Sequence, residues 1–209
     1  TSTPTSTVTP TATETPTATD TPTASNTPTP QALSLKKAVV GNALVLGILQ
    51  NGTLVTWGIN QNPLFQSRIP TTYKNMLFKD VAASISSSFA VDTNGNLYAW
   101  GDSAYNILDI PVEARTGIKA VGAGARFAFA IKESDGSIIG WGGSAKGELP
   151  GPALTNVEQL DGGANHVVAV KSEGTLVAWG LNAMGQATVP PGVTNAIQVS
   201  AGEDHSLAL

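Results

Sequence analysis

Two features of this 209-residue chain predict an all-β repeat fold. The dipeptide Trp-Gly recurs about every 40 residues, and each copy follows an Asn-Gly, Asp-Gly or Glu-Gly pair. Before each of these pairs, apolar residues alternate with other residues, which is the period of a β-strand. Short strands in repeats of this length are typical of the blades of a β-propeller, and four-stranded blades are expected. The repeated tryptophans are Trp57, Trp100, Trp141 and Trp179.

Residues 1–32 are expected to form a disordered linker or stalk. Thr-Pro-Thr recurs at a fixed interval between Thr3 and Thr29, and most other residues of the segment are Thr, Ser or Ala. Such a segment has too few apolar side chains to offset the entropy lost on ordering. Thr/Pro tracts have the composition of O-glycosylated stalks on exported proteins. An extracellular or cell-surface location is therefore expected, and the first residue, Thr1, suggests a segment cut from a longer precursor.

Residues 33–209 are expected to form the propeller blades. Each repeat begins at a small residue, and the strand that follows carries two large apolar residues with Gly or Ala between them. One face of this strand therefore fits closely against a neighbour. The small starting residues are Gly41, Ser84, Gly124, Gly163 and Gly202. The apolar pairs are Leu46 and Ile48, Phe89 and Val91, Phe129 and Ile131, Val168 and Val170, and Leu207 and Leu209.

A hairpin turn and a second strand complete the recognisable part of each repeat. Asn-Gly between apolar runs is a strong hairpin signal, because both residues tolerate positive φ. In the strand that follows, Leu54 and Trp57 are an odd number of residues apart and point to opposite faces. Both faces therefore need cover, and the tryptophans are expected to be largely buried packing residues. The turn glycines, also expected to be structural, are Gly52, Gly95, Gly136 and Gly174.

The remainder of each repeat is a Gly/Asn/Pro-rich loop and a further weak strand, as in Ala196–Val199. Five strands carry the apolar pair, but only four second strands, those ending in Trp-Gly, are present, so the last strand with an apolar pair lacks a hairpin partner. We therefore expect an open arc of about four blades, with Leu207 and Leu209 on an exposed and association-prone edge. A closed ring of four blades is the alternative.

The segments 163–170, 174–186 and 199–209 resemble the repeats of the regulator-of-chromosome-condensation family. The resemblance covers residues from about 35 to 209. Repeats this short, with Val-Pro after Gly-Gln, are similar to the bacterial type found in a secreted propeller inhibitor of β-lactamase. The resemblance implies a bacterial source and a propeller that typically has seven blades, of which this chain would be an open fragment.

Composition and motifs argue against several functions. The formal charge is −4 with only 12% charged residues. No stretch of Lys and Arg is dense enough to bind along a phosphate backbone, so nucleic acid is not an expected partner. No apolar run reaches the ~18 residues of a membrane span. His166 and His205 occupy the same slot in adjacent repeats without a carboxylate at a fixed spacing, so they are expected to be structural. No metal, cofactor or catalytic residue is predicted.

Four residues break the repeat and are the candidates for partner binding. Arg126 and Phe127 replace a mostly small or polar pair, and Asp102 follows Trp-Gly where other repeats have Ile, Gly or Leu. Tyr105 lies in the same loop. In the inhibitor relatives these slots lie on the ligand-binding face, but there they are rich in aromatics and aspartates. The resemblance therefore supports the fold and does not support a β-lactamase as partner.

The sequence favours a non-enzymatic binding module that presents a propeller face to a protein or glycan partner. One alternative is a carbohydrate-active enzyme on a propeller scaffold, which an activity screen would reveal. A second is a small-GTPase exchange factor, by analogy with the founding member of the family. The inserted hairpin of such factors is not evident, and a Thr/Pro stalk argues against a nuclear protein.

Overall fold

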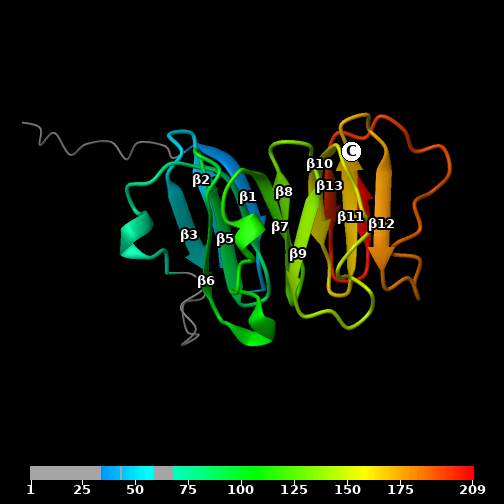
Figure 1. Ribbon diagram of the computed structural model, residues 1–209, viewed down its shortest axis with the longest axis horizontal. Coiled ribbons are helices and arrows are strands. Elements are labelled where there is room, and N and C mark those ends of the chain that lie inside the picture. The colour runs from blue at the N-terminus through cyan, green and yellow to red at the C-terminus, as the bar shows by residue number, and fades with distance from the viewer. Residues whose placement is uncertain (1–33, 43, 59–67) are drawn as a thin grey trace, which may run out of the picture. The chain divides into compact units, whose positions relative to one another are not determined.

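The computed structural model describes residues 34–42, 44–58 and 68–209 (Figure 1). The expected stalk, residues 1–32, lies outside the described residues, and its disorder stays a prediction. The blades belong to one unit, Leu33–Leu209. No helix among the described residues is long and apolar enough to cross a membrane.

Five antiparallel sheets follow one another along the described chain and form blades one to five. In blades one to four the chain order of the strands is also their order in the sheet (Figure 1). Blade one is β1 (Leu35–Val40), β2 (Leu44–Leu49) and β3 (Leu54–Gly58). Blade two is β4 (Phe78–Ala83), β5 (Ser87–Asp92) and β6 (Leu97–Gly101). Blade three is β7 (Ile118–Ala123), β8 (Phe127–Lys132) and β9 (Ile138–Gly142). Blade four is β10 (Val157–Gly162), β11 (His166–Lys171) and β12 (Leu176–Gly180). Blade five has β13 (Val199–Ala201) and β14 (Ser206–Ala208).

The prediction of blades is confirmed, but the complete blades have three strands in the described residues and not the expected four. The weak strand assigned to the end of each repeat is the first strand of the next blade. The segments between blades contain prolines, which lack the N–H that a strand ladder requires. These segments form turns and short 3₁₀ helices: η1 (Thr71–Tyr73) after Pro70, η2 (Ala104–Asn106), and η3 (Val112–Ala114) after Pro111.

The apolar cores lie between successive blades. Large residues on the middle strand of one blade meet the small residue on the middle strand of the next, as Phe89 meets Ala130 and Phe129 meets Ala169. These four residues are completely buried. The close approach expected from the alternation of large and small residues is therefore the contact that stacks the blades.

Polar side chains join the first strands of neighbouring blades. The Asp80 carboxylate of blade two pairs with Lys37 of blade one through Oδ1, and its Oδ2 accepts a 2.8 Å hydrogen bond from the Val121 backbone N–H of blade three. Gln159 likewise bonds both the N–H and the C=O of Val199, each at 3.1 Å. Because these hydrogen bonds involve backbone groups of the next blade, they fix the register between blades.

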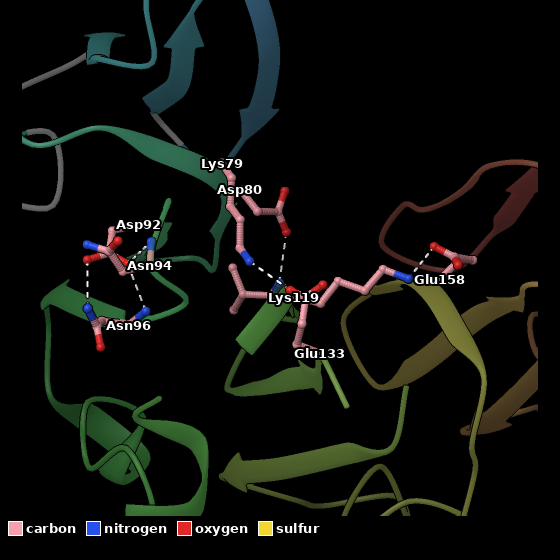
Figure 2. Close-up of polar contacts among 9 residues, drawn as sticks. Lys79, Asp80, Asp92, Asn94, Asn96, Lys119, Glu133 and Glu158 are labelled. Carbon is pink, nitrogen blue, oxygen red and sulfur yellow. Dashed lines mark hydrogen bonds and ion pairs between the residues drawn. The ribbon is translucent and has the colours of Figure 1, made fainter. Parts of the chain in front are cut away.

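More exposed ion pairs accompany these contacts (Figure 2). Lys79 of blade two contacts Glu133 of blade three at 2.8 Å, and Lys119 of blade three pairs with Glu158 of blade four. Exposed pairs of this kind contribute about 1 kcal/mol or less. The apolar cores therefore dominate the stability of the stack.

The hairpin turns follow the prediction in part. Gly52, Gly95, Gly136 and Gly174 have φ between 65° and 86°, but the residues before them are not left-handed. In the turns of blades one to three, an acidic or amide side chain accepts backbone N–H groups instead. Asp92, for example, accepts hydrogen bonds of 2.9 Å from Asn94 and 2.8 Å from Asn96 (Figure 2).

The prediction that all four tryptophans are largely buried is wrong for Trp57. Trp100 and Trp141 are 7% and 6% exposed, Trp179 is half-buried, and Trp57 is 47% exposed. The cause is the direction of packing. Each buried tryptophan covers the blade before its own, as Trp141 of blade three covers Phe89 of blade two. No blade precedes blade one among the described residues, so Trp57 has no such surface to cover.

The last strand has the exposure expected of a free edge. Leu207 and Leu209 are 62% and 74% exposed. No strand among the described residues pairs with the far side of β14, and no described sheet contains strands of both blade one and blade five. These features agree with an open row of blades and not with a laced four-bladed ring.

Candidate functional site

The candidate site lies on one end of the blades, here called the turn face. It consists of the turns between the first and second strands of each blade, together with the segment that follows β6 and carries Asp102 and Tyr105. A central depression of about 360 Å³ on this face is lined mainly by Gly, Ala and other small residues of all five turns. The turns are residues 41–43, of which residue 43 lies outside the description, 84–86, 124–126, 163–165 and 202–205.

Three of the four predicted partner-binding residues meet beside this depression. Asp102, Tyr105 and Arg126 line a recess of about 200 Å³ at the junction of blades two and three. The Arg126 guanidinium carbon lies 4.8 Å from the centre of the Tyr105 ring, which is the geometry of a cation–π contact. Both side chains are exposed, Tyr105 at 53%. The recess thus displays a cation and an aromatic ring together.

Asp102 shapes the recess. Its Oδ1 accepts the Ala104 backbone N–H at 3.0 Å, and its Oδ2 accepts the Ser86 hydroxyl at 3.4 Å. Its own carbonyl accepts the Ser87 hydroxyl at 2.6 Å. These bonds fix the start of η2 onto the turn before β5. The Asp102 carboxylate therefore positions Tyr105 through the backbone.

Tyr105 has a strained backbone. Its φ of 61° lies in the left-handed region, which is uncommon for a residue other than Gly, Asn or Asp. The ring lies over Gly143 of blade three, where an added Cβ would be 3.0 Å from the Tyr105 Cβ. Backbone strain of about 1–3 kcal/mol is often found at functional sites. The strain here aims an aromatic side chain at the junction between two blades.

Phe127, the fourth candidate, does not belong to this surface. It is 1% exposed and packs in the core between blades three and four. The turn directs its side chain back over the glycine three residues earlier, and a Cβ on Gly124 would lie 2.2 Å from Phe127 Cζ. The prediction that Phe127 contacts a partner is therefore wrong. The recess is lined instead by Ile85, which is 48% exposed and was not among the residues predicted from the sequence.

The two histidines occupy the same slot as Phe127 but differ in exposure. His166 is completely buried between blades four and five, whereas His205 is exposed. His166 Nε2 lies 3.0 Å from the Ser206 hydroxyl, which donates to the Gln186 carbonyl at 2.8 Å. Nε2 must then carry the proton, and the buried Nδ1 has no hydrogen-bond partner. Within the described residues, no group of three or more His, Cys, Asp or Glu could hold a metal.

This arrangement predicts that stability depends on the charge of His166. Burial lowers the pKa of His166 below its usual range, although the nearby Asp204 carboxylate acts in the opposite direction. The unfolded chain therefore binds a proton more readily than the folded chain. Stability should be constant above the pKa of an unfolded histidine, about 6.5, and should fall below it by at most about 1.4 kcal/mol per pH unit.

Urea unfolding between pH 7.5 and pH 5 would measure this decrease. The variant His166→Phe places in blade four the residue that blade three has in this slot, and we expect it to lose that part of the pH dependence. The matched control His205→Phe changes an exposed histidine and should retain it. An identical pH profile for wild type and His166→Phe would contradict the assignment.

Comparison with known proteins agrees with this architecture. A model of the regulator of chromosome condensation (RCC1) repeat matches residues 78–107 and 157–186, which run from the first strands of blades two and four into the segments after their third strands. Protein pim1 of Schizosaccharomyces pombe is 25% identical over 200 residues, covering 81% of this chain and 34% of pim1. The ultraviolet-B receptor UVR8 of Arabidopsis thaliana is 27% identical over 225 residues, covering 85% of this chain and 51% of the receptor. The chain thus spans about a third and about half of these relatives.

Solved structures share the fold at lower identity. Prp20p of Saccharomyces cerevisiae superimposes with a TM-score of 0.69 and 16% identity, over 84% of this chain and 56% of Prp20p. The ectodomain of the Arabidopsis thaliana receptor kinase ACR4 superimposes with a TM-score of 0.60 and 19% identity, over 84% of this chain and 59% of the ectodomain. The matched repeats, the relatives and the fold agree that this chain contains repeats of the RCC1 type.

Proposed function

We propose that this chain is a non-enzymatic binding module of an exported or cell-surface protein, and that its turn face binds a protein partner. The observation that carries the proposal is the recess at the junction of blades two and three. There Ile85, Tyr105 and Arg126 stand exposed beside a depression lined by small residues. Tyr and Arg are enriched among residues that dominate binding energies at protein interfaces.

The chemistry of the recess indicates the kind of group that would bind. The Asp102 carboxylate is occupied by Ser86 and the Ala104 N–H, whereas the Arg126 guanidinium faces solvent over the Tyr105 ring. A partner carboxylate could accept hydrogen bonds from the guanidinium, and a neighbouring apolar side chain could cover Ile85 and the ring. An acidic residue beside an apolar one, on the surface of a folded protein, fits this arrangement best.

The comparisons support a protein partner and an external location by analogy. The Prp20p structure is described together with its binding to Gsp1p and histones, which are proteins. The ACR4 structure is that of a receptor-kinase ectodomain. The Thr/Pro composition of residues 1–32 is consistent with a spacer outside the cell. Loss of the chain from intact source cells on treatment with external protease would test the location, and full protection would contradict it.

The binding proposal is tested by measuring affinity for proteins captured from source-cell surfaces, first with the whole chain and then with variants. Arg126→Ala combined with Tyr105→Ala should weaken binding at least tenfold, which corresponds to about 1.4 kcal/mol. Arg115→Ala removes an exposed cation outside the recess and serves as the charge-matched control. Melting temperatures of all variants establish that the fold is intact.

Unchanged affinity of the double variant would refute the recess as the binding site. A glycan array probed in parallel tests the glycan alternative. Glycan binding that disappears in the double variant, without a captured protein, would replace the protein partner with a glycan. Glycan cleavage lost in the same variant would favour the carbohydrate-active enzyme instead.

A further inference from the structure

A second surface, separate from the recess, lies beside the third strand of blade two and is here called the outer groove. Its volume is about 760 Å³, which lies within the range of small-molecule binding sites. It is lined by β6 with the residue before it, by Tyr73 of η1, and by the segment 108–112 with Arg115. No residue that lines the outer groove also lines the recess.

Two tyrosine rings line the outer groove. Tyr73 and Tyr98 are half-buried, and their ring centres lie 5.1 Å apart. The Tyr98 hydroxyl donates to the buried Asp92 carboxylate at 3.2 Å, which holds its ring in place. The face of an aromatic ring carries partial negative charge. It therefore attracts C–H groups that neighbouring oxygens polarise, such as those on one side of a sugar ring.

Polar side chains around these rings retain hydrogen-bonding capacity. Asp109 is exposed, and its carboxylate accepts no hydrogen bond from the described residues. Arg115 donates from Nε to the Ile110 carbonyl at 3.1 Å, and its other N–H groups have no described partner. A carboxylate only accepts hydrogen bonds and a guanidinium only donates them, whereas a hydroxyl does both. A ligand with neighbouring hydroxyls can thus bind both side chains.

The charges and the backbone of the outer groove favour a neutral sugar over a peptide. Asp109 and Arg115 are the charged residues of its described lining, so their charges cancel. An acidic sugar or a charged peptide would lie beside one like charge. The Leu97 N–H on the outer edge of β6 already donates to the Arg115 carbonyl at 3.0 Å. A peptide strand added to β6 could therefore not use that group.

We propose that the outer groove is a second binding site, and that its ligand is a neutral oligosaccharide of hexose or N-acetylhexosamine units. One sugar ring lies against the tyrosines, while its hydroxyls donate to Asp109 and accept from Arg115. Leu108 and Val112, the latter 72% exposed, provide apolar contacts for a second unit or an acetyl group. The site is independent of the protein partner proposed for the recess.

An array of neutral hexose and N-acetylhexosamine oligosaccharides, probed with the labelled whole chain, tests the proposal. We expect saturable binding, measured by titration of the oligosaccharide with the strongest signal. Asp109→Ala should weaken it by about tenfold or more, the usual order for a lost hydrogen bond to a charged group. Glu113→Ala changes an exposed acid of the same segment that does not line the groove, and should leave the affinity unchanged.

Two variants of Tyr98 separate the role of the aromatic ring from that of its hydroxyl. Both lose the hydrogen bond to Asp92, but only Tyr98→Phe keeps the ring. Tyr98→Leu should bind the oligosaccharide about three- to tenfold more weakly than Tyr98→Phe, which is the order expected for one aromatic contact. Melting temperatures establish that the variants fold. Asp109→Ala removes no described contact, so it tests the site even where a Tyr98 variant is unstable.

No binding on the array, or equal affinity of wild type and Asp109→Ala, would overturn the proposal. Glycan binding that is lost on combining Arg126→Ala with Tyr105→Ala, but kept in Asp109→Ala, would place the glycan in the recess and would also overturn it. Protein binding unchanged in that double variant refutes the recess alone, so the two proposals fail separately. Binding of an extended peptide that Asp109→Ala abolishes, without glycan binding, would assign the groove to a peptide and would overturn the proposal of a sugar.

Discussion

Replacing Trp141 with Ala should lower the free energy of unfolding by about 3–5 kcal/mol, the usual range when a core aromatic is removed. Trp141 is 6% exposed, its ring covers Phe89, and its indole N–H donates to the Ile107 carbonyl. The substitution therefore leaves a cavity between blades two and three and removes the donor from a carbonyl near the buried side chain of Ile107. Urea unfolding followed by circular dichroism would measure the loss.

Trp57→Ala is the matched control, because it changes the same slot of the repeat. Trp57 is 47% exposed and has no preceding blade among the described residues to cover. We expect a loss of about 1 kcal/mol or less, within the range of exposed positions. Equal losses for the two variants would show that the tryptophans act within their own blades, and the direction of packing inferred above would be wrong.

This contrast shows how much of the fold the sequence could predict. The repeat, the strands, the turn glycines and the packing of Phe89 or Phe129 on alanine follow from local patterns, and the structure confirms them. The exposure of Trp57 depends on which blade precedes its own, and a repeated residue carries no information about its neighbour in space. The prediction of a fourth strand in each blade was wrong. The weak apolar run after each proline-containing loop has the same pattern whether it ends one blade or begins the next, so the sequence could not assign it to either blade.

The recess could be predicted in part for a similar reason. Asp102, Tyr105 and Arg126 break the repeat, and the structure brings them together at one junction. Phe127 breaks it too, but the turn directs this side chain over Gly124, a direction that depends on backbone geometry. Ile85 lies in a degenerate copy of the repeat where no pattern marks it. Departure from the repeat therefore identified positions, but it could not distinguish an inward side chain from an outward one.

The second large effect is expected for Gly163→Ala, which should destabilise the chain by about 2–3 kcal/mol. A Cβ at Gly163 would lie 2.4 Å from the Gly202 carbonyl oxygen and 2.4 Å from the His166 ring. The carbonyl belongs to the backbone of blade five, and the ring is completely buried, so neither can move without separating blades four and five. The φ of Gly163 is not in the left-handed region, so steric overlap and not backbone strain causes the loss.

Gly47→Ala is the control that separates overlap from a general effect of adding a methyl group. Gly47 lies in β2, where the other repeats have alanine, and its Cβ would lie 2.8 Å from a Leu35 side-chain carbon. Leu35 is 43% exposed and can rotate away. Because alanine is favoured over glycine within a strand by about 0.5–1 kcal/mol, this variant should be neutral or more stable. Urea midpoints are measured for the two variants side by side. Similar losses, or none for Gly163→Ala, would mean that the turns at Gly163 and Gly202 do not make the close contact that stacks blades four and five.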